Sequence, residues 1–177
     1  MKAYLVVDMS NDFVADDGGL SVGKPAQAIV KNILARLDAF NRNGDIIAFC
    51  MDAHTNDDKH FDLWPKHCVI GTWGAQLYGE IFTWYESHKQ SPKVLYIPKT
   101  EYDAFYHTNL GDILRSFKVD KVVVSGVCTD ICVMNTVYGA YKEGFATVVN
   151  KSDVATFTPN GEVFLESMAN FYHTKLE

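Results

Sequence analysis

The sequence lacks a long hydrophobic run. Its first apolar stretch is stopped by Asp8 and followed by Asn11 and Asp12, and no later run approaches the roughly 18 apolar residues that a membrane-spanning helix requires. The first stretch is also too short to be the core of a signal peptide. We therefore expect a protein with neither a membrane span nor a secretory leader.

Cysteine and positive charge are scarce as well. The four cysteines have neither the density of a disulfide framework nor the CxxC spacing of a zinc site, so we expect reduced thiols and a cytoplasmic protein. Sixteen lysines and arginines against 22 acidic residues give a net charge of −6, which leaves no basic surface for binding phosphates. Neither nucleic acid nor a membrane is therefore expected as a partner.

The composition is that of a globular domain. Hydrophobic residues make up 47% of the chain and charged residues 21%, close to the soluble average, which argues against disorder and against a simple coiled coil. No internal repeat, low-complexity tract or linker divides the sequence. Its 177 residues suit one hydrophobic core, so we predict a single domain over residues 1–177.

Short apolar runs alternate with helical patterns along the chain. The strand-like runs are Tyr4–Val7, Ile46–Met51, Val94–Ile97, Val122–Ser125 and Phe145–Val149. The helical patterns cover Pro25–Asn41, Gly74–Glu86, Leu110–Phe117, Asp130–Lys142 and Gly161–Phe171. Because the apolar runs are continuous rather than alternating, we expect strands that are buried on both faces. The order predicts a three-layer α/β/α fold, Rossmann-like, with a mainly parallel central sheet.

Ligands of such sheets bind beyond the carboxyl ends of the strands. Polar residues follow four of the predicted strands at this point: Asp8, then Asp52 with His54, then Lys99, then the segment Ser125–Cys132. We expect these residues to converge along one edge of the sheet.

Cys132 is the candidate nucleophile. It would lie in the first turn of a helix, where free backbone N–H groups and the helix dipole favour a thiolate. By position alone, a small buried and inert cysteine is the more common alternative. Asp8 could take the thiol proton and return it to a leaving amine, while Lys99 could stabilise negative charge on the thiolate or the carboxylate. Singly, Asp8 could equally cap a loop and Lys99 could face solvent, so only their joint placement supports catalysis.

A metal site is the second candidate. Asp52 and His54 would lie on one side of an extended segment, since side chains alternate with period two, and His67 could complete the site. Two nitrogens and one carboxylate suit zinc, iron or manganese. The candidates for a further ligand, among which spacing does not choose, are His60, Asp58 and Asp62.

Six segments follow one another with a specific pattern over about residues 4–150. They are Val7–Phe13, Asp52–His54, Trp64–Cys68, Gly71–Ala75, Lys99–Phe105 and Gly126–Val133. In this order the pattern resembles the isochorismatase-like cysteine hydrolases, and within them the nicotinamidases. The resemblance implies an isochorismatase-like fold and an amidohydrolase that converts nicotinamide to nicotinate and ammonia, and that also accepts pyrazinamide. It further suggests self-association into a homo-oligomer.

The resemblance also implies roles for single residues. The catalytic triad would be Cys132, Asp8 and Lys99. One divalent transition metal, zinc by preference and otherwise iron or manganese, would be held by Asp52, His54 and His67, with His60 as the first choice for a further ligand.

The remaining implied roles concern the substrate. Backbone N–H groups of Cys128 and Cys132 would form the oxyanion hole, with a non-proline cis peptide before Cys128. The residues expected around the flat ring, for which ordinary core packing is the alternative, are Phe13 and Trp64 on its two sides with Leu20 and Tyr102 nearby.

Two other functions compete with this one. A metal-free relative could hydrolyse isochorismate, ureidoacrylate or a carbamoyl compound with the same triad, and the metal-capable residues of this chain argue against it. A receiver-like signalling domain would use Asp52 as its phosphoacceptor and Asp8 as a magnesium ligand. That domain needs a shorter chain and leaves the histidines and Cys132 without a role.

Overall fold

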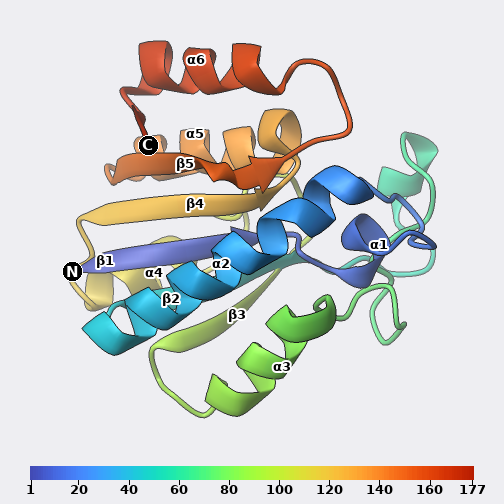
Figure 1. Cartoon of the computed structure of the whole chain (residues 1–177), viewed down its shortest axis with the longest axis horizontal. Helices are drawn as coiled ribbons and strands as arrows, with labels where there is room; N and C mark the ends of the chain where they lie inside the picture. The colour runs from blue at the N-terminus through green and yellow to red at the C-terminus, as the bar shows by residue number, and fades with distance from the viewer.

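The computed structural model describes residues 1–177 and contains one six-stranded sheet whose neighbouring strands are all parallel. From edge to edge the order is β3-β2-β1-β4-β5-β6 (Figure 1). The strands are β1 (Lys2–Val7), β2 (Ile46–Asp52), β3 (Val94–Lys99), β4 (Lys121–Val127), β5 (Ala146–Ala155) and β6 (Lys175–Leu176). The predicted α/β fold with a parallel central sheet is confirmed.

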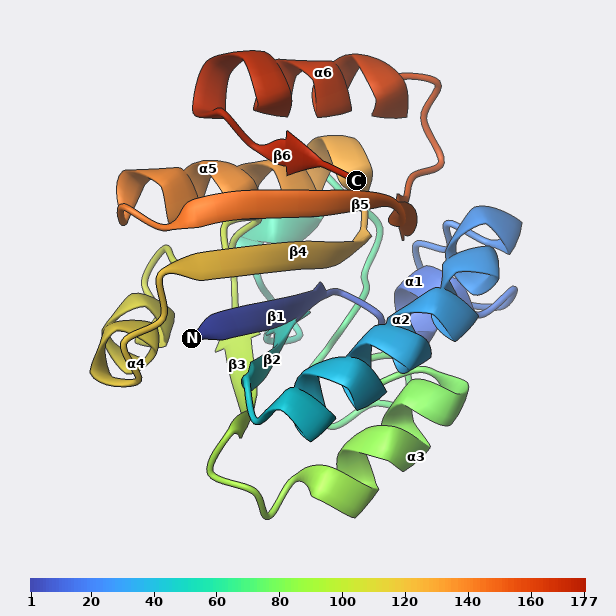
Figure 2. The same cartoon turned by 60° about the vertical axis from the view of Figure 1, so that its left-hand side comes forward.

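Helices cover both faces of the sheet. They are α1 (Asn11–Val14), α2 (Lys24–Asn43), α3 (Gly79–His88), α4 (Leu110–Ser116), α5 (Met134–Lys142) and α6 (Gly161–Tyr172), with a 3-10 turn η1 (Lys59–Asp62) and a π-helical turn η2 (Thr129–Val133). Apolar side chains of α2 and α3 share one core with the sheet, and those of α4, α5 and α6 share the other (Figures 1 and 2). This arrangement gives the three layers that the sequence predicts.

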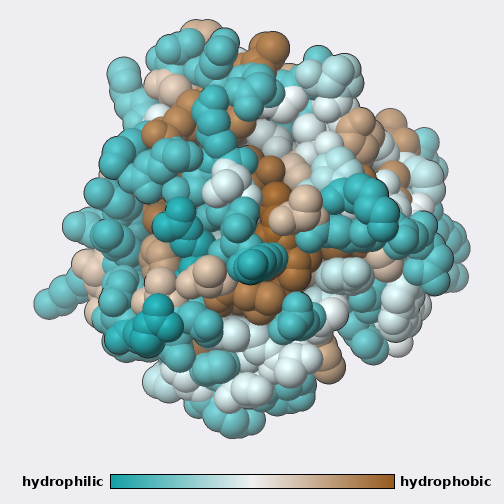
Figure 3. Space-filling view, in the orientation of Figure 1, coloured by the Kyte–Doolittle hydropathy of each residue, from teal (hydrophilic) through white to brown (hydrophobic).

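Helix α2 shows how the sequence produces one of these layers. Pro25 stands in its first turn, where the missing N–H of proline costs no hydrogen bond. Ile29, Ile33 and Leu37 recur at helical spacing and are buried against the sheet, each contributing about 1.5–3 kcal/mol. The face of the molecule on which α2 lies is largely hydrophilic, with a smaller hydrophobic area near its middle (Figure 3). None of the helices combines the length and the apolar character that crossing a membrane requires.

Two element boundaries differ from the prediction by five residues or more, the end of β5 and the start of α3. Strand β5 was expected to end at Val149, but it continues past the exposed Lys151 and Ser152 to Ala155, because the residues after this polar interruption are buried again. The helix expected from Gly74 begins at Gly79. The segment before Gly79 is not helical because its carbonyl groups bind another part of the chain. Gly74 O accepts a hydrogen bond from Asp12 N, and Gln76 O accepts one from Asn11 N.

Three further features were not predicted. The helix expected over residues 130–142 begins with the π-helical turn η2, and only from Met134 is it α-helical. The four-residue helix α1 and the two-residue strand β6 are too short to produce a periodic pattern in the sequence.

The strand register brings the carboxyl ends to one level. Val7 pairs with Cys50 on one side and with Gly126 on the other, and Asp52 pairs with Lys99. Gly126 has φ +106°, and a Cβ there would lie 1.9 Å from the carbonyl oxygen of Val7. Only glycine therefore lets β4 approach β1 this closely where the candidate residues leave the sheet.

Candidate active site

Three residues expected to act together meet at the carboxyl ends of β1 and β3 and in η2. Lys99 Nζ lies 2.7 Å from Asp8 Oδ2 and also forms an ion pair with Asp52. Ligand atoms of Asp8, Asp52 and Cys132, which include the Cys132 sulfur, all lie within 4.8 Å of one another. All four side chains are buried. The structure thus joins a thiol, two carboxylates and an ammonium group in one water-poor cluster.

The pKa values of the two carboxylates are shifted in opposite directions, because Asp8 and Asp52 have different charged neighbours. Burial and the charge of Asp52 raise the pKa of Asp8 above its ordinary value. Burial would also raise the pKa of Asp52, but Lys99 and the nearby imidazoles hold it well below its usual range. Burial opposes the charge of Lys99, yet Asp52 and Asp8 raise its pKa well above the ordinary value. Asp52 is therefore a permanent anion, whereas Asp8 can exchange a proton.

Cys132 differs from the expectation of a thiolate. It lies in the π-helical turn rather than at the start of an α-helix, and it is buried. Burial raises the pKa of the Cys132 thiol well above its usual value, and Asp8 and Asp52 act in the same direction against Lys99. The resting group is therefore a thiol, and if this sulfur is the nucleophile its proton must first pass to a base, for which Asp8 is the candidate.

Cys128 lies at the start of η2, directly after β4. The peptide bond between Val127 and Cys128 is cis, and the backbone N–H of Cys128 makes no hydrogen bond within the protein. Burial raises the pKa of the Cys128 thiol to about 12, and this thiol is not part of the cluster that Cys132 forms with Asp8 and Asp52. The side chain is a poorer nucleophile than that of Cys132, while its N–H remains free to bind an oxyanion.

A metal-capable cluster adjoins the thiol. Nitrogen atoms of His54, His60 and His67 lie within 4.8 Å of one another. Asp52 Oδ2 lies 3.6 Å from Nε2 of His54 and 3.6 Å from Nε2 of His67, too far for hydrogen bonds and suited to sharing a cation. Asp52 therefore belongs to both clusters, with one oxygen facing Lys99 and the other facing the histidines.

The outer nitrogens of the His54 and His67 rings are already engaged in hydrogen bonds. Nδ1 of His54 lies 3.0 Å from Asp58 Oδ2, and Nδ1 of His67 lies 2.7 Å from the Pro65 carbonyl oxygen. These acceptors fix the proton on Nδ1 and leave the lone pairs of Nε2 facing inward. Nε2 of His54 is buried and has no hydrogen-bond partner, which a bound cation would satisfy.

The donor set fits a divalent transition metal. Burial favours the neutral ring of His54, but the carboxylates of Asp52 and Asp58 outweigh it and raise the pKa of that ring. Burial and the two other histidines lower the pKa of His60, which keeps this ring neutral and able to act as a ligand. Two or three imidazoles with one carboxylate are a ligand set that zinc accepts.

A narrow cavity joins the two clusters. Its lining contains all four residues expected around the substrate ring, together with Asp52, His60, His67, Cys128 and Cys132. Trp64 Nε1 donates a hydrogen bond to the Tyr102 hydroxyl at 2.9 Å, which fixes the indole at one side. The cavity wall is mainly apolar and contains a few polar groups, as is usual for a pocket that binds a flat ring with one polar substituent.

Two cavity residues, Ile131 and Phe157, were not anticipated. Phe157 packs edge-on against Trp64 with ring centroids 6.5 Å apart. Its loop is held by Asp130, which accepts hydrogen bonds from the hydroxyls of Thr156 and Thr158. Phe157 follows the true end of β5, so the rule that ligands bind after parallel strands would have found it had the strand been extended to Ala155.

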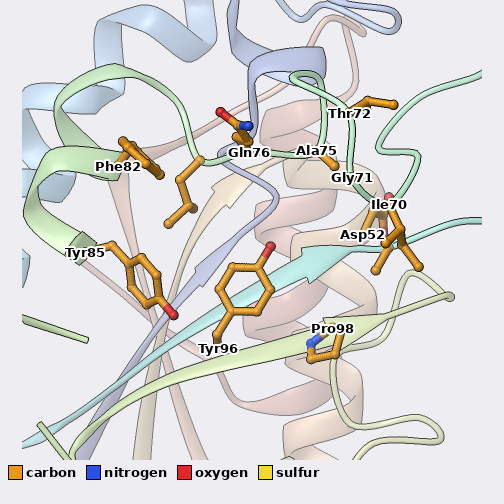
Figure 4. Close-up of a pocket in the computed structure, with 12 residues that line it drawn as sticks. Asp52, Ile70, Gly71, Thr72, Ala75, Gln76, Phe82, Tyr85, Tyr96 and Pro98 are labelled. Atoms are coloured by element: carbon orange, nitrogen blue, oxygen red, sulfur yellow. The ribbon is translucent and has the colours of Figure 1, made fainter. Parts of the chain in front are cut away.

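A larger hollow lies beside the edge strand β3, and the rings of Phe82, Tyr85 and Tyr96 are among the side chains that line it (Figure 4). It shares only Asp52 with the narrow cavity, and no thiol or imidazole lines it. The chemistry is therefore assigned to the narrower cavity.

Comparison with known proteins agrees with this fold and site. A family model described as the isochorismatase domain matches residues 2–173, so the chain belongs to the isochorismatase family. The chain is similar to nicotinamidase/pyrazinamidase PncA of Bacillus subtilis, with 38% identity and a TM-score of 0.96 over 99% of this chain and 98% of that one.

Two further solved structures are informative. The chain is similar to the pyrazinamidase/nicotinamidase of Streptococcus mutans UA159, with 39% identity and a TM-score of 0.96 over 100% of both chains. It is also similar to the pyrazinamidase of Pyrococcus horikoshii in complex with zinc, with 28% identity and a TM-score of 0.88 over 99% of this chain and 98% of that one.

Proposed function

We propose that this protein is a nicotinamidase that hydrolyses nicotinamide to nicotinate and ammonia, and pyrazinamide likewise, with residues 1–177 acting as one hydrolase domain. The observation that carries the proposal is the contact of a buried thiol with a proton-accepting carboxylate beside a metal-capable set of histidines. The full-length similarity to enzymes named as nicotinamidases and pyrazinamidases supports the choice of substrate. Its reaction would belong to the recovery of nicotinamide for NAD synthesis.

Asp52, His54 and His67, with His60 at the side, would hold one divalent transition metal, zinc by preference. When bound, such a metal supplies a Lewis acid for the pyridine nitrogen of the substrate. The chain's own aromatic side chains would hold the ring: Phe13 and Trp64 lie in the cavity wall with Leu20 and Tyr102. Together these groups would bring the carboxamide carbon to about 3–3.5 Å from the Cys132 sulfur.

Asp8 and Cys132 would carry the covalent chemistry. Asp8 takes the thiol proton as the sulfur forms a bond to the carboxamide carbon, and backbone N–H groups of Cys128 and Cys132 bind the oxyanion. When the C–N bond breaks, Asp8 returns the proton to the leaving nitrogen, and ammonia departs from a thioester. Water then attacks the thioester carbon while Asp8 accepts its proton; the C–S bond breaks, Asp8 returns the proton to the sulfur, and the product leaves as the acid, which ionises to nicotinate. Lys99 holds both carboxylates in place throughout.

Ammonia release tests the proposal. The purified protein is assayed with nicotinamide, pyrazinamide and a carbamoyl compound, before and after chelation and after re-addition of zinc, manganese or iron. We expect turnover of both aromatic amides, its loss on chelation and its recovery with metal. Unchanged activity after chelation, in a protein free of transition metal by elemental analysis, would instead support a metal-free relative with the same triad.

Two expectations about the protein's setting stay predictions. All four cysteines are free, which supports a reducing compartment such as the cytoplasm. Self-association is tested by light scattering of the purified protein. The receiver-like alternative gains no support, since Asp52 is 4% exposed and ion-paired with Lys99, so phosphate would have no access to it.

A further inference from the structure

The motif at residues 7–13 contains an acid for which the proposed reaction has no use. Asp12 lies in α1, is half-buried, and does not line the catalytic cavity. Its carboxylate forms no ion pair. Instead, Oδ2 accepts a hydrogen bond from Cys68 N at 2.6 Å, and Oδ1 accepts one from Gly19 N at 2.8 Å. Both oxygens of this charged carboxylate thus accept hydrogen bonds from the backbones of two separate loops.

The backbone of Asp12 binds the same region. Asp12 N donates to Gly74 O at 2.9 Å, and Leu20 N donates to Asp12 O at 3.1 Å. A Cβ on Gly74 would lie 2.1 Å from Asp12 Oδ2, so the chain passes the carboxylate at a distance that only glycine permits. One residue therefore fastens three loops, those around residues 19, 68 and 74.

Two of these loops carry cavity residues. Cys68 directly follows the candidate ligand His67, and its carbonyl oxygen accepts a hydrogen bond from His54 N at 3.1 Å. The backbone of Cys68 is thus hydrogen-bonded to Asp12 through its N–H and to His54 through its carbonyl oxygen, and it is covalently joined to His67. The second loop carries Leu20, which lines the ring cavity one residue after Gly19.

We propose that Asp12 is a positioning residue that fixes the metal-binding histidines and the Leu20 wall together, through the peptide groups of Cys68 and Gly19. A charged acceptor binds each of these N–H groups more strongly than a neutral acceptor would. Groups that hydrogen-bond to metal ligands, and so fix their orientation, affect the affinity of the site for the metal. This inference rests on the proposed metal site, and its substrate part rests on the proposed function.

The test measures zinc affinity of the metal-free protein by competition with a chromophoric chelator. Asp12→Asn keeps the shape of the side chain but turns an NH2 group toward one of the two N–H donors. Gly74→Ala keeps the Asp12 side chain but adds a methyl group that would collide with its carboxylate. We expect each variant to bind zinc about tenfold more weakly or worse, and Asp12→Asn to raise KM for nicotinamide.

Two control variants separate positioning from general loss of stability. Asp16→Asn makes the same charge change at an exposed acid four residues away, and Leu37→Ala weakens the core under α2 away from these loops. Both should bind zinc within about twofold of the unaltered protein at a temperature where circular dichroism shows every variant folded. The proposal is overturned if Asp12→Asn also binds within about twofold, if Leu37→Ala loses as much affinity as Asp12→Asn, or if the unaltered protein binds no zinc. Since zinc binding is read without substrate, failure to hydrolyse nicotinamide would refute the proposed function and leave this test intact.

Discussion

Replacement of Lys99 by methionine should destabilise the protein in a pH-dependent way. Methionine has nearly the length of lysine but no charge, so the substitution removes the single cation that neutralises Asp8 and Asp52 and leaves little void. All three side chains are at most 4% exposed. Removing one member of a buried ion pair costs about 3–5 kcal/mol, because the remaining charge is neither paired nor hydrated.

The pH dependence follows from the protons that the carboxylates would take up. In the Lys99→Met variant, a buried aspartate must fold in its neutral form, and protonating a carboxyl of ordinary pKa about 3.9 costs about 4 kcal/mol at pH 7 but only about 1.5 kcal/mol at pH 5. The folded pKa in the variant is raised above the unfolded value, so the variant gains stability as pH falls and loses it as pH rises. The unaltered protein also gains about 1.3 kcal/mol over this range, because Asp8 with its pKa of about 6 takes up a proton in the folded state, so the gap in stability between the two proteins should shrink by about 1–1.5 kcal/mol between pH 7 and pH 5.

Urea unfolding followed by circular dichroism, in chelator at both pH values, measures this gap. In a separate thermal unfolding experiment at pH 7, the Tm of the variant should be lower than that of the unaltered protein by roughly 6–20 °C for a chain of this size. Lys31→Met, at an exposed position of α2, is the matched control and should change stability by less than about 0.5 kcal/mol. A Lys99→Met protein that is as stable as the original at pH 7, or that loses equally at both pH values, would refute the view that Lys99 neutralises buried carboxylates.

Four further outcomes are expected. Cys132→Ala should lower kcat for nicotinamide by at least about 10³-fold while zinc content is unchanged, whereas Cys128→Ala should keep most of the activity; the reverse order would make Cys128 the nucleophile. Burial and its acidic neighbour raise the pKa of Asp8 to about 6, so kcat/KM should fall as pH drops through about 6 and the base becomes protonated; a profile flat to pH 4.5 would exclude this base. Phe157→Ala should raise KM about two- to tenfold with little change in kcat, as steady-state kinetics would show, and an unchanged KM would remove this ring from the binding site. Asp58→Ala should weaken zinc binding about 10–100-fold in a chelator competition, because it frees the outer nitrogen of a ligand histidine, and full affinity would contradict that role.

The elements, and the meeting of Asp8, Asp52 and Lys99, could be predicted from sequence because they follow from periodic rules, whereas the aromatic cavity wall was expected only from the family resemblance. Continuous apolar runs identify buried parallel strands, and parallel strands end at one edge, which is why Asp8, Asp52 and Lys99 could be placed together before any coordinates. The hydrophobic stripe of α2 is similarly visible as a repeat. These signals are local, and each depends on a few neighbouring residues.

Other features depend on contacts between distant residues. The bond from Cys68 N to Asp12 spans 56 positions and leaves no periodic trace. Phe157 was missed because the polar Lys151 and Ser152 interrupt β5 without ending it. The helix dipole led us to expect a lowered pKa for the Cys132 thiol, whereas this pKa is raised. Burial and the two adjacent acids raise it, and only the folded structure reveals them.

The same burial explains how one lysine can serve two tasks. Asp8 and Asp52 share Lys99, yet one pKa is raised and the other lowered, because Asp52 also faces two imidazoles while Asp8 faces a thiol. Environments that separate the pKa values of two acids assign them different functions. Asp52 stays ionised, as its proposed role as a metal ligand requires, and Asp8 can take up a proton, as its proposed role as the base requires. Exchanging these environments, rather than removing either acid, would be needed to exchange their roles.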